Sequence, residues 1–293
     1  MSITLTQLRS FLAVIRGGSV TTAADELVVT QPSVSAAIAA LSHEVGTPLF
    51  ERSGRGVRPT AAGRAFAPFA ADVIGLLEVG RRAAREAAEV DARVLRIAAV
   101  TTAAESFVPA LMRSFAEEHP DVRLALSVGN RGQMLDLLLR HEADVAFGGR
   151  PPADARIVAQ AFLPNELVLV CAADDPLAGA ERASPEQLAG RTWLLREPDS
   201  GTRSANEEFL AATGLSADTL TVGSNGAIRQ AARLGLGISF LSRDAVASDL
   251  QAGLLGVIGV DPAPAPRDWH VMRAATGPPR PLVEEFLAFV ARP

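Results

Sequence analysis

The chain has 293 residues, 48% of them hydrophobic, which is enough for two domains with apolar cores. Its net charge is −5, and its single cysteine excludes an internal disulfide. All 28 basic residues are arginine, so lysine-dependent P-loop sites, Schiff-base enzymes and kinases are excluded.

Two short helices separated by a tight break are predicted near the N-terminus. Ser19 follows two glycines and can cap a helix over residues 20–27, and Thr30 can cap the next helix. Pro32 sits in the first turn of this second helix, where its missing N–H costs nothing. The spacing indicates a helix-turn-helix over residues 20–39, although two helices of an ordinary bundle would show the same pattern. The residues placed to contact DNA are Thr30, Gln31, Pro32, Ser33, Ser35 and Ala36.

A glycine-rich turn follows between residues 49 and 60. It carries three arginines at a spacing of three: Arg52, Arg55 and Arg58. We interpret it as a β-hairpin wing that holds guanidinium groups beside phosphates or in the minor groove. An ordinary solvated loop is the alternative. Residues 1–66 hold six arginines and four acidic residues, whereas the rest holds 22 and 29, so basic charge gathers at the end predicted to bind DNA.

One long helix is predicted over residues 61–89. Its apolar stripe is suited to packing against a second copy of the same helix, and consists of Phe66, Phe69, Val73, Leu76 and Leu77. Packing of this stripe on its own domain is the alternative. Pro68 lies inside the helix and should bend it.

After residue 91 the pattern changes to strands that alternate with helices, which indicates an α/β fold. The predicted strands cover residues 94–100, 122–128, 145–147, 167–171, 192–195, 220–222, 238–241 and 269–273. The predicted helices cover residues 103–118, 132–140, 203–212, 227–234 and 282–291. We expect two successive α/β units, with the last strand and helix returning to the first, so that two crossings make a hinge.

Polar residues follow the carboxyl ends of several of these strands. Open parallel sheets bind ligands at this edge, where helices begin. Hydroxyl, amide and guanidinium groups gathered there indicate a small anion, either a carboxylate or a phosphate ester. For each residue alone, helix capping explains the residue type as well as ligand contact does. The candidate effector-binding residues are Thr101, Thr102, Asn130, Arg131, Arg150, Ser200, Thr202, Arg203 and Asn225.

Several short segments occur together at fixed spacing: Leu8-Arg9-Ser10-Phe11, Gly18-Ser19, Ala23-Ala24, Thr30-Gln31-Pro32-Ser33-Val34-Ser35, Leu49-Phe50-Glu51-Arg52 and Pro59-Thr60. Through them, residues 3–65 resemble the N-terminal domain of the LysR-type transcriptional regulators. The chain departs from that family at Ala36, Ala37 and Ala39, where long polar residues are usual. We therefore expect an operator that is read weakly or through DNA shape.

The resemblance implies a domain plan for the whole chain. Its parts are a winged helix-turn-helix at 1–60, a linker helix at 61–89 and a two-lobed effector domain of the periplasmic-binding-protein type at 91–293, with lobe I at 91–163 and 267–293 and lobe II at 164–266. It implies double-stranded DNA with an interrupted palindromic operator as partner, a small anionic effector, a homodimer through the linker helix and a homotetramer. RNA polymerase is a further candidate partner.

Two segments narrow the resemblance. Residues 101–109 through 128–131, together with 196–203, resemble the LysR-type regulators of carbon-dioxide fixation operons. The effectors of those regulators are phosphorylated metabolites or nicotinamide nucleotides.

Signals for an enzyme or a metal site are poor. The four histidines, His43, His119, His141 and His270, have no metal-ligand spacing, and no cofactor motif occurs. Cys171 ends an apolar run, which favours a buried thiol. A solute-binding protein or an enzyme on the same fold with a DNA-binding head is the alternative function, although we find no catalytic base in the expected cleft. With no signal-peptide pattern or long apolar run, we expect a cytoplasmic protein without a membrane partner.

Overall fold

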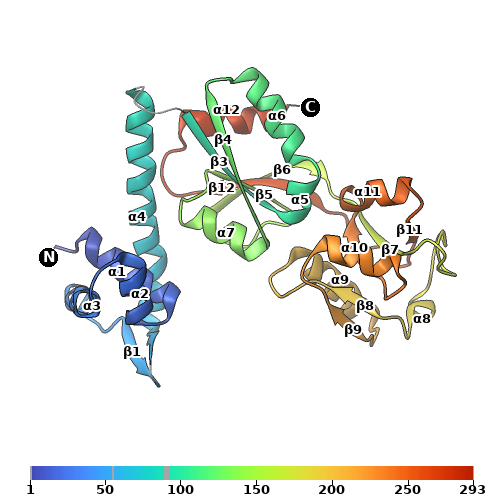
Figure 1. Cartoon of the computed structure of the whole chain (residues 1–293), viewed down its shortest axis with the longest axis horizontal. Helices are drawn as coiled ribbons and strands as arrows, with labels where there is room; N and C mark the ends of the chain where they lie inside the picture. Colours follow the sequence, from blue (N-terminus) through green and yellow to red (C-terminus); the bar gives the residue numbers. More distant parts are fainter. Residues whose placement is uncertain (1, 55, 89–92, 293) are drawn as a thin grey trace. The chain divides into compact units, whose positions relative to one another are not determined.

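The computed structural model of the protein describes residues 2–54, 56–88 and 93–292 (Figure 1). The chain divides into two compact units, one of residues 1–91 with 139–142 and the other of residues 92–138 with 143–293. Within the described ranges, no helix combines the length and the apolar character needed to cross a membrane.

The N-terminal unit holds the predicted helix-turn-helix and wing. Its elements are α1 (Leu5–Gly17), α2 (Val20–Leu27), α3 (Gln31–Val45), β1 (Phe50–Ser53), β2 (Gly56–Pro59) and α4 (Ala61–Ala87). The two predicted caps are confirmed, since Ser19 Oγ accepts from the Thr22 N–H at 3.0 Å and Thr30 Oγ1 accepts from the Ser33 N–H at 3.4 Å. The tight break between α2 and α3 begins at Val28, whose φ of 56° ends the first helix.

Helix α4 runs through Pro68 without interruption. The apolar stripe predicted on this helix divides between two surroundings. Phe66 is half-buried with its ring centroid 5.5 Å from that of Phe11, so it packs on its own domain. Phe69, Val73 and Leu77 are 69%, 49% and 40% exposed and form an apolar strip at a spacing of four. For Phe66 the structure therefore follows the alternative, in which the stripe packs on its own domain, and not the expected packing against a second copy of the helix.

The second unit begins with a lobe built on a five-stranded sheet. Its strands run in the order β4-β3-β5-β12-β6, where β3 (Arg93–Val100), β4 (Val122–Gly129) and β5 (Val145–Gly148) are parallel and β12 (Asp268–Ala274) is antiparallel to both β5 and β6 (Ile157–Pro164). The helices are α5 (Thr101–Glu105), α6 (Val108–Glu118), α7 (Arg131–Leu139) and α12 (Pro281–Val290). Residues 95, 97 and 99 of β3 pack toward α6 and α12, whereas residue 98 packs toward α7, so helices cover both faces (Figure 1).

The second lobe is built around β7 (Leu167–Ala172), which lies between two antiparallel partners. The elements of this lobe are β7, β8 (Trp193–Leu195), β9 (Thr219–Thr221), β10 (Ser239–Ser242), β11 (Leu255–Ile258), α8 (Pro185–Leu188), α9 (Gly201–Thr213), α10 (Asn225–Arg233) and α11 (Arg243–Gln251). Leu169 and Cys171 face the core that includes Phe209 of α9. Val168 and Val170 face the core that α10 and α11 cover.

The chain passes between the two lobes twice, at residues 165–166 and 259–267. The two crossings are joined by a backbone hydrogen bond in which the Asn165 N–H donates to the Arg267 carbonyl at 2.8 Å. A pair of adjacent crossings is the arrangement on which hinge motion between lobes depends.

Two sequence expectations differ from the structure of this unit. The helix expected over residues 103–118 is two helices, because Ser106 leaves helical geometry and its hydroxyl donates to the Thr102 carbonyl at 2.7 Å. Pro109 then fits in the first turn of α6, where no N–H is needed. Strands β6 and β11 and helices α8 and α11 were not expected from the sequence.

Two glycines of α4 offer a matched test of packing. A Cβ at Gly63 would lie 2.1 Å from the Leu49 carbonyl oxygen, whereas a Cβ at Gly80 meets nothing within 4 Å. We expect Gly63→Ala to destabilise the N-terminal unit by about 1–3 kcal/mol because backbone must move. Gly80→Ala should stabilise it by up to about 1 kcal/mol through helix propensity. Amide hydrogen exchange of the N-terminal helices measures both, and equal protection in the two variants would contradict the close approach of α4 to Leu49.

Candidate functional site

The residues predicted to contact DNA lie on the exposed side of α3 and on the wing. Gln31, Pro32, Ser33, Ser35 and Ala36 are all exposed, as is Thr30, whose hydroxyl also caps the helix. The outer face of α3 therefore presents the Gln31 amide and the Ser33 and Ser35 hydroxyls beside small apolar groups, and the Ser33 hydroxyl is already hydrogen-bonded to that of Thr30 at 2.8 Å. Such a face offers few hydrogen bonds to base edges.

The wing is a hairpin in which β1 and β2 are antiparallel. Glu51 lies opposite Arg58, and their side chains form an exposed ion pair at 2.9 Å. Arg52 lies opposite Val57 and is exposed. Arg55, the third predicted arginine of the wing, lies outside the described residues. Of the two wing arginines that the structure describes, Arg58 is paired with Glu51, and Arg52 is the one that can meet a phosphate without first breaking an ion pair.

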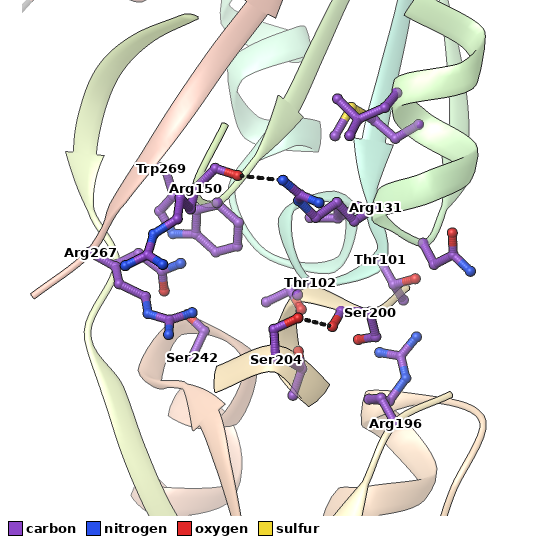
Figure 2. A pocket seen from close by; sticks show the side chains of 18 of the residues that line it. Thr101, Thr102, Arg131, Arg150, Arg196, Ser200, Ser204, Ser242, Arg267 and Trp269 are labelled. Carbon is purple, nitrogen blue, oxygen red and sulfur yellow. Dashed lines mark hydrogen bonds between the residues drawn. The ribbon is translucent and has the colours of Figure 1, made fainter. Parts of the chain in front are cut away.

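A cavity of about 300 Å³ lies between the two lobes of the second unit (Figure 2). It opens at the carboxyl ends of β3, β4 and β5 and at the N-terminus of α9, so free backbone N–H groups and strand-end side chains surround it. Its polar lining residues are Thr101, Thr102, Asn130, Arg131, Arg150, Asn165, Arg196, Ser200, Thr202, Ser204, Glu208, Ser242 and Arg267.

A buried guanidinium forms the base of this cavity on the second lobe. Arg196 is 5% exposed, and Glu197 accepts two hydrogen bonds from it, at 2.7 and 2.9 Å. Its third bond, at 2.6 Å, goes to Asn225 Oδ1, and Asn225 Nδ2 donates in turn to Thr102 Oγ1 on the first lobe. Burial raises the pKa of the Glu197 carboxyl, but the bonds from Arg196 outweigh it and hold that pKa below its usual value.

Three further arginines approach the cavity on its other side. Arg131 Nη2 donates to the Arg150 carbonyl at 3.5 Å, and none of the ion pairs in the described ranges involves Arg131 (Figure 2). Glu208 accepts from both remaining guanidinium groups, at 3.4 Å from Arg150 and 2.7 Å from Arg267. Burial lowers the pKa of Arg267, partly offset by Glu208, and the neighbouring charge of Arg150 lowers it further.

Several polar atoms of the lining are buried without a hydrogen-bond partner among the described residues. They are Asn165 Oδ1, Ser242 Oγ and Arg267 Nε. Ser200 occupies the N-cap position of α9, but its hydroxyl makes no capping bond. Because buried polar groups are nearly always paired, such atoms are the ones that a bound ligand or water would satisfy.

Most of the predicted effector residues line this cavity. Seven do so: Thr101, Thr102, Asn130, Arg131, Arg150, Ser200 and Thr202. Arg203 does not, since its guanidinium pairs with Glu207 and donates to the Arg196 carbonyl. Asn225 lies beneath the cavity, where it holds Arg196. Helix capping explains the residue type at Asn130, which exchanges hydrogen bonds with Gln133. It does not explain Thr102, which lies inside α5.

Sequence reasoning missed six polar lining residues: Asn165, Arg196, Ser204, Glu208, Ser242 and Arg267. Arg196 follows the end of β8 and could have been found by the strand-end rule that found Arg150. Arg267 and Asn165 lie in the two crossings, whose meeting depends on tertiary structure. Glu208 lies in the interior of α9, where local sequence marks no site.

Comparison with known proteins decides the family. Residues 5–64 match the bacterial regulatory helix-turn-helix proteins of the lysR family, and residues 88–292 match the LysR substrate binding domain. The chain belongs to the LysR family of transcriptional regulators. Its N-terminal unit is the DNA-binding part and its second unit the effector-binding part, so the predicted fold class is confirmed.

Curated relatives of this LysR protein cover almost its full length. The RuBisCO operon transcriptional regulator of Acidithiobacillus ferrooxidans is 34% identical over 98% of this chain and 93% of its own length. The transcriptional activator CmpR of Synechocystis is 35% identical over 92% of this chain and 88% of its own. The predicted resemblance to regulators of carbon-dioxide fixation operons is confirmed.

Solved structures extend the comparison. The regulatory domain of Synechocystis PCC6803 CcmR in complex with 2-PG is 31% identical, with a TM-score of 0.64 over 68% of this chain and 95% of that one. Full-length OxyR C199D from Pseudomonas aeruginosa is 26% identical, with a TM-score of 0.67 over 100% of this chain and 95% of that one. CbnR, at 21% identity over 98% of both chains and a TM-score of 0.64, shows the shared fold alone.

The single thiol of this LysR regulator lies in the core of the second lobe. Cys171 is fully buried on β7. Burial and the charge of Asp175 raise its pKa to about 11, with Arg191 opposing the shift. A thiol in this state carries almost no thiolate near neutral pH, and thiolate is the reactive form.

We expect Cys171 to be inert in the native protein. At pH 8, well below the pKa of about 11, a water-soluble maleimide should label it only after denaturant unfolds the second lobe. Mass spectrometry with and without urea measures the labelling. Rapid labelling of the folded protein would contradict the buried position of the thiol.

Proposed function

We propose that this regulator binds a small phosphorylated anion in the cavity between its lobes and thereby changes how it contacts or bends its operator. The observation that carries the proposal is the cavity itself, with Arg131, Arg150 and Arg267 on one side and the N-terminus of α9 on the other. Phosphate oxygens accept well from guanidinium groups and from helix N-terminal N–H groups. The structure of CcmR with 2-PG, at 31% identity, supports the same ligand class.

The proposed mechanism is a shift in the population of lobe arrangements. A ligand in the cavity touches Thr101 and Arg131 on the first lobe and Ser200 and Thr202 on the second. It favours the arrangement in which both sets of contacts form, and the paired crossings are where the chain can adjust. The resulting movement repositions the DNA-binding heads of an oligomer.

We propose that the oligomer is a homodimer through α4, and that dimers assemble into a tetramer. Phe69, Val73 and Leu77 form the exposed apolar strip that a second α4 would cover. A two-fold dimer reads two half-sites, which corresponds to an interrupted palindromic operator. We place this assembly in the cytoplasm, with RNA polymerase as a further partner.

We propose that its target genes serve carbon-dioxide fixation. Two relatives at 34% identity, each named as a RuBisCO operon transcriptional regulator, support this proposal. The small side chains on the outer face of α3 support an operator that is recognised through DNA shape as much as through base contacts.

The wing contact is tested with Arg52→Ala. We expect weaker binding to every DNA sequence, because a phosphate contact carries no sequence information. The slope of log K against log salt concentration should fall in magnitude by about 1. Arg113→Ala is the control, since Arg113 is an exposed arginine of α6 that pairs with Glu117. Fluorescence anisotropy at several salt concentrations measures both variants, and an unchanged slope for Arg52→Ala would remove the wing from the interface.

The effector site is tested with Thr202→Val and 2-phosphoglycolate (2-PG). At about 100 times its Kd, a ligand that binds only the native state stabilises it by about 2.7 kcal/mol. Loss of a hydroxyl that donates to a charged group costs about 1.5–3 kcal/mol, so most of this gain should disappear in Thr202→Val while DNA binding persists. Thr221→Val, on the exposed strand β9, is the control. The melting temperature is the readout, and a wild-type response in Thr202→Val would place the ligand elsewhere.

A further inference from the structure

Glu208 is the one carboxylate among the residues that line the cavity in the described part of the chain. It lies on α9 of the second lobe and accepts from Arg150, which follows β5 of the first lobe, and from Arg267 in the second crossing. We propose that the Glu208 carboxylate is an internal competitor for the effector's anionic group, and so determines the charge that an effector must carry. This inference rests on the proposed effector site.

Among Glu208, Arg150 and Arg267, Glu208 is the residue whose side chain can move out of the cavity. The Arg267 side chain is 13% exposed, whereas the Glu208 side chain is 49% exposed. Each carboxylate oxygen of Glu208 meets a different guanidinium, so the carboxylate lies where one anionic group of a ligand would bind both arginines. A half-exposed glutamate can rotate into water at little cost, while the buried arginine stays in place.

The charge balance of the cavity indicates which kind of anion replaces the Glu208 carboxylate. Arg131, Arg150, Arg196 and Arg267 face two glutamates, Glu208 and Glu197, which leaves an excess of two positive charges. Glu197 is fixed by two hydrogen bonds to Arg196. Glu208 is the carboxylate that can be exchanged, and a dianion in its place would bring the cavity closer to neutrality.

Competition within the chain then selects among ligands. A tethered carboxylate is present at an effective concentration of millimolar or more, so a free monocarboxylate gains little by replacing it. A phosphate monoester carries close to two charges at neutral pH and more acceptor oxygens, and it can displace Glu208. The protein thereby responds to phosphorylated metabolites in the presence of abundant simple carboxylates.

The test compares the full-length wild type with Glu208→Gln in isothermal titration with inorganic phosphate and with glycolate. Removal of the competing charge should tighten phosphate binding about tenfold, as expected for one unit charge about 3 Å away at a dielectric close to that of water, because the Glu208 side chain is 49% exposed. Glycolate should show no measurable binding to the wild type but should bind Glu208→Gln. Glu117→Gln is the matched control, since it removes one exposed carboxylate from an ion pair with Arg113 on α6 and should change nothing.

A second variant separates charge from contact. Glu208→Asp keeps the charge but shortens the side chain, so it should bind phosphate with an affinity between those of the wild type and Glu208→Gln. Circular dichroism melting checks that each variant is folded. Phosphate binding by Glu208→Gln that is equal to or weaker than that of the wild type overturns the role of Glu208 and leaves the proposed effector site standing. Absence of phosphate and 2-phosphoglycolate binding in every protein overturns both.

Discussion

A buried positive charge must be neutralised inside the protein, and Arg196 imposes that requirement on the second lobe. Glu197 supplies the opposite charge, and Asn225 uses its amide oxygen for the last bond. The other end of the Asn225 amide is then free to reach Thr102 across the boundary between the lobes. One buried guanidinium therefore shapes the base of the cavity and links the second lobe to the helix that begins at Thr101.

The helix-turn-helix was predictable because its signals are local. Ser19 and Thr30 each cap a helix within three residues of their own position, and Pro32 marks a first turn whatever the rest of the chain does. Strand ends were predictable for a similar reason, which is why Arg131 and Arg150 were found. These inferences need only a short window of sequence.

The missed parts of the site depend on contacts that no short window contains. Arg267 reaches Glu208 over 59 residues, and the Asn165 N–H bonds a carbonyl in the other crossing. Strand β11 was missed because it contains Gly256, and glycine weakens a strand prediction. In the structure this glycine allows the strand to approach Ala178 closely. Phe66 was assigned to the stripe for a second copy of α4, because periodicity gives the spacing of apolar residues but does not reveal that Phe11 packs against the Phe66 ring.

The position of β12 has a consequence for synthesis of the chain. This strand follows all the others in sequence, yet it lies between β5 and β6 in the five-stranded sheet. Its Trp269 ring packs edge-to-face against Phe107. A nascent chain emerges from its N-terminus and folds as it does so. The second lobe has all its strands once residue 258 has emerged, while the first lobe still lacks a central strand. The DNA-binding end of the protein is therefore complete well before the lobe that regulates it, and termination before residue 268 would leave β5 as an open sheet edge and β6 without its partner strand.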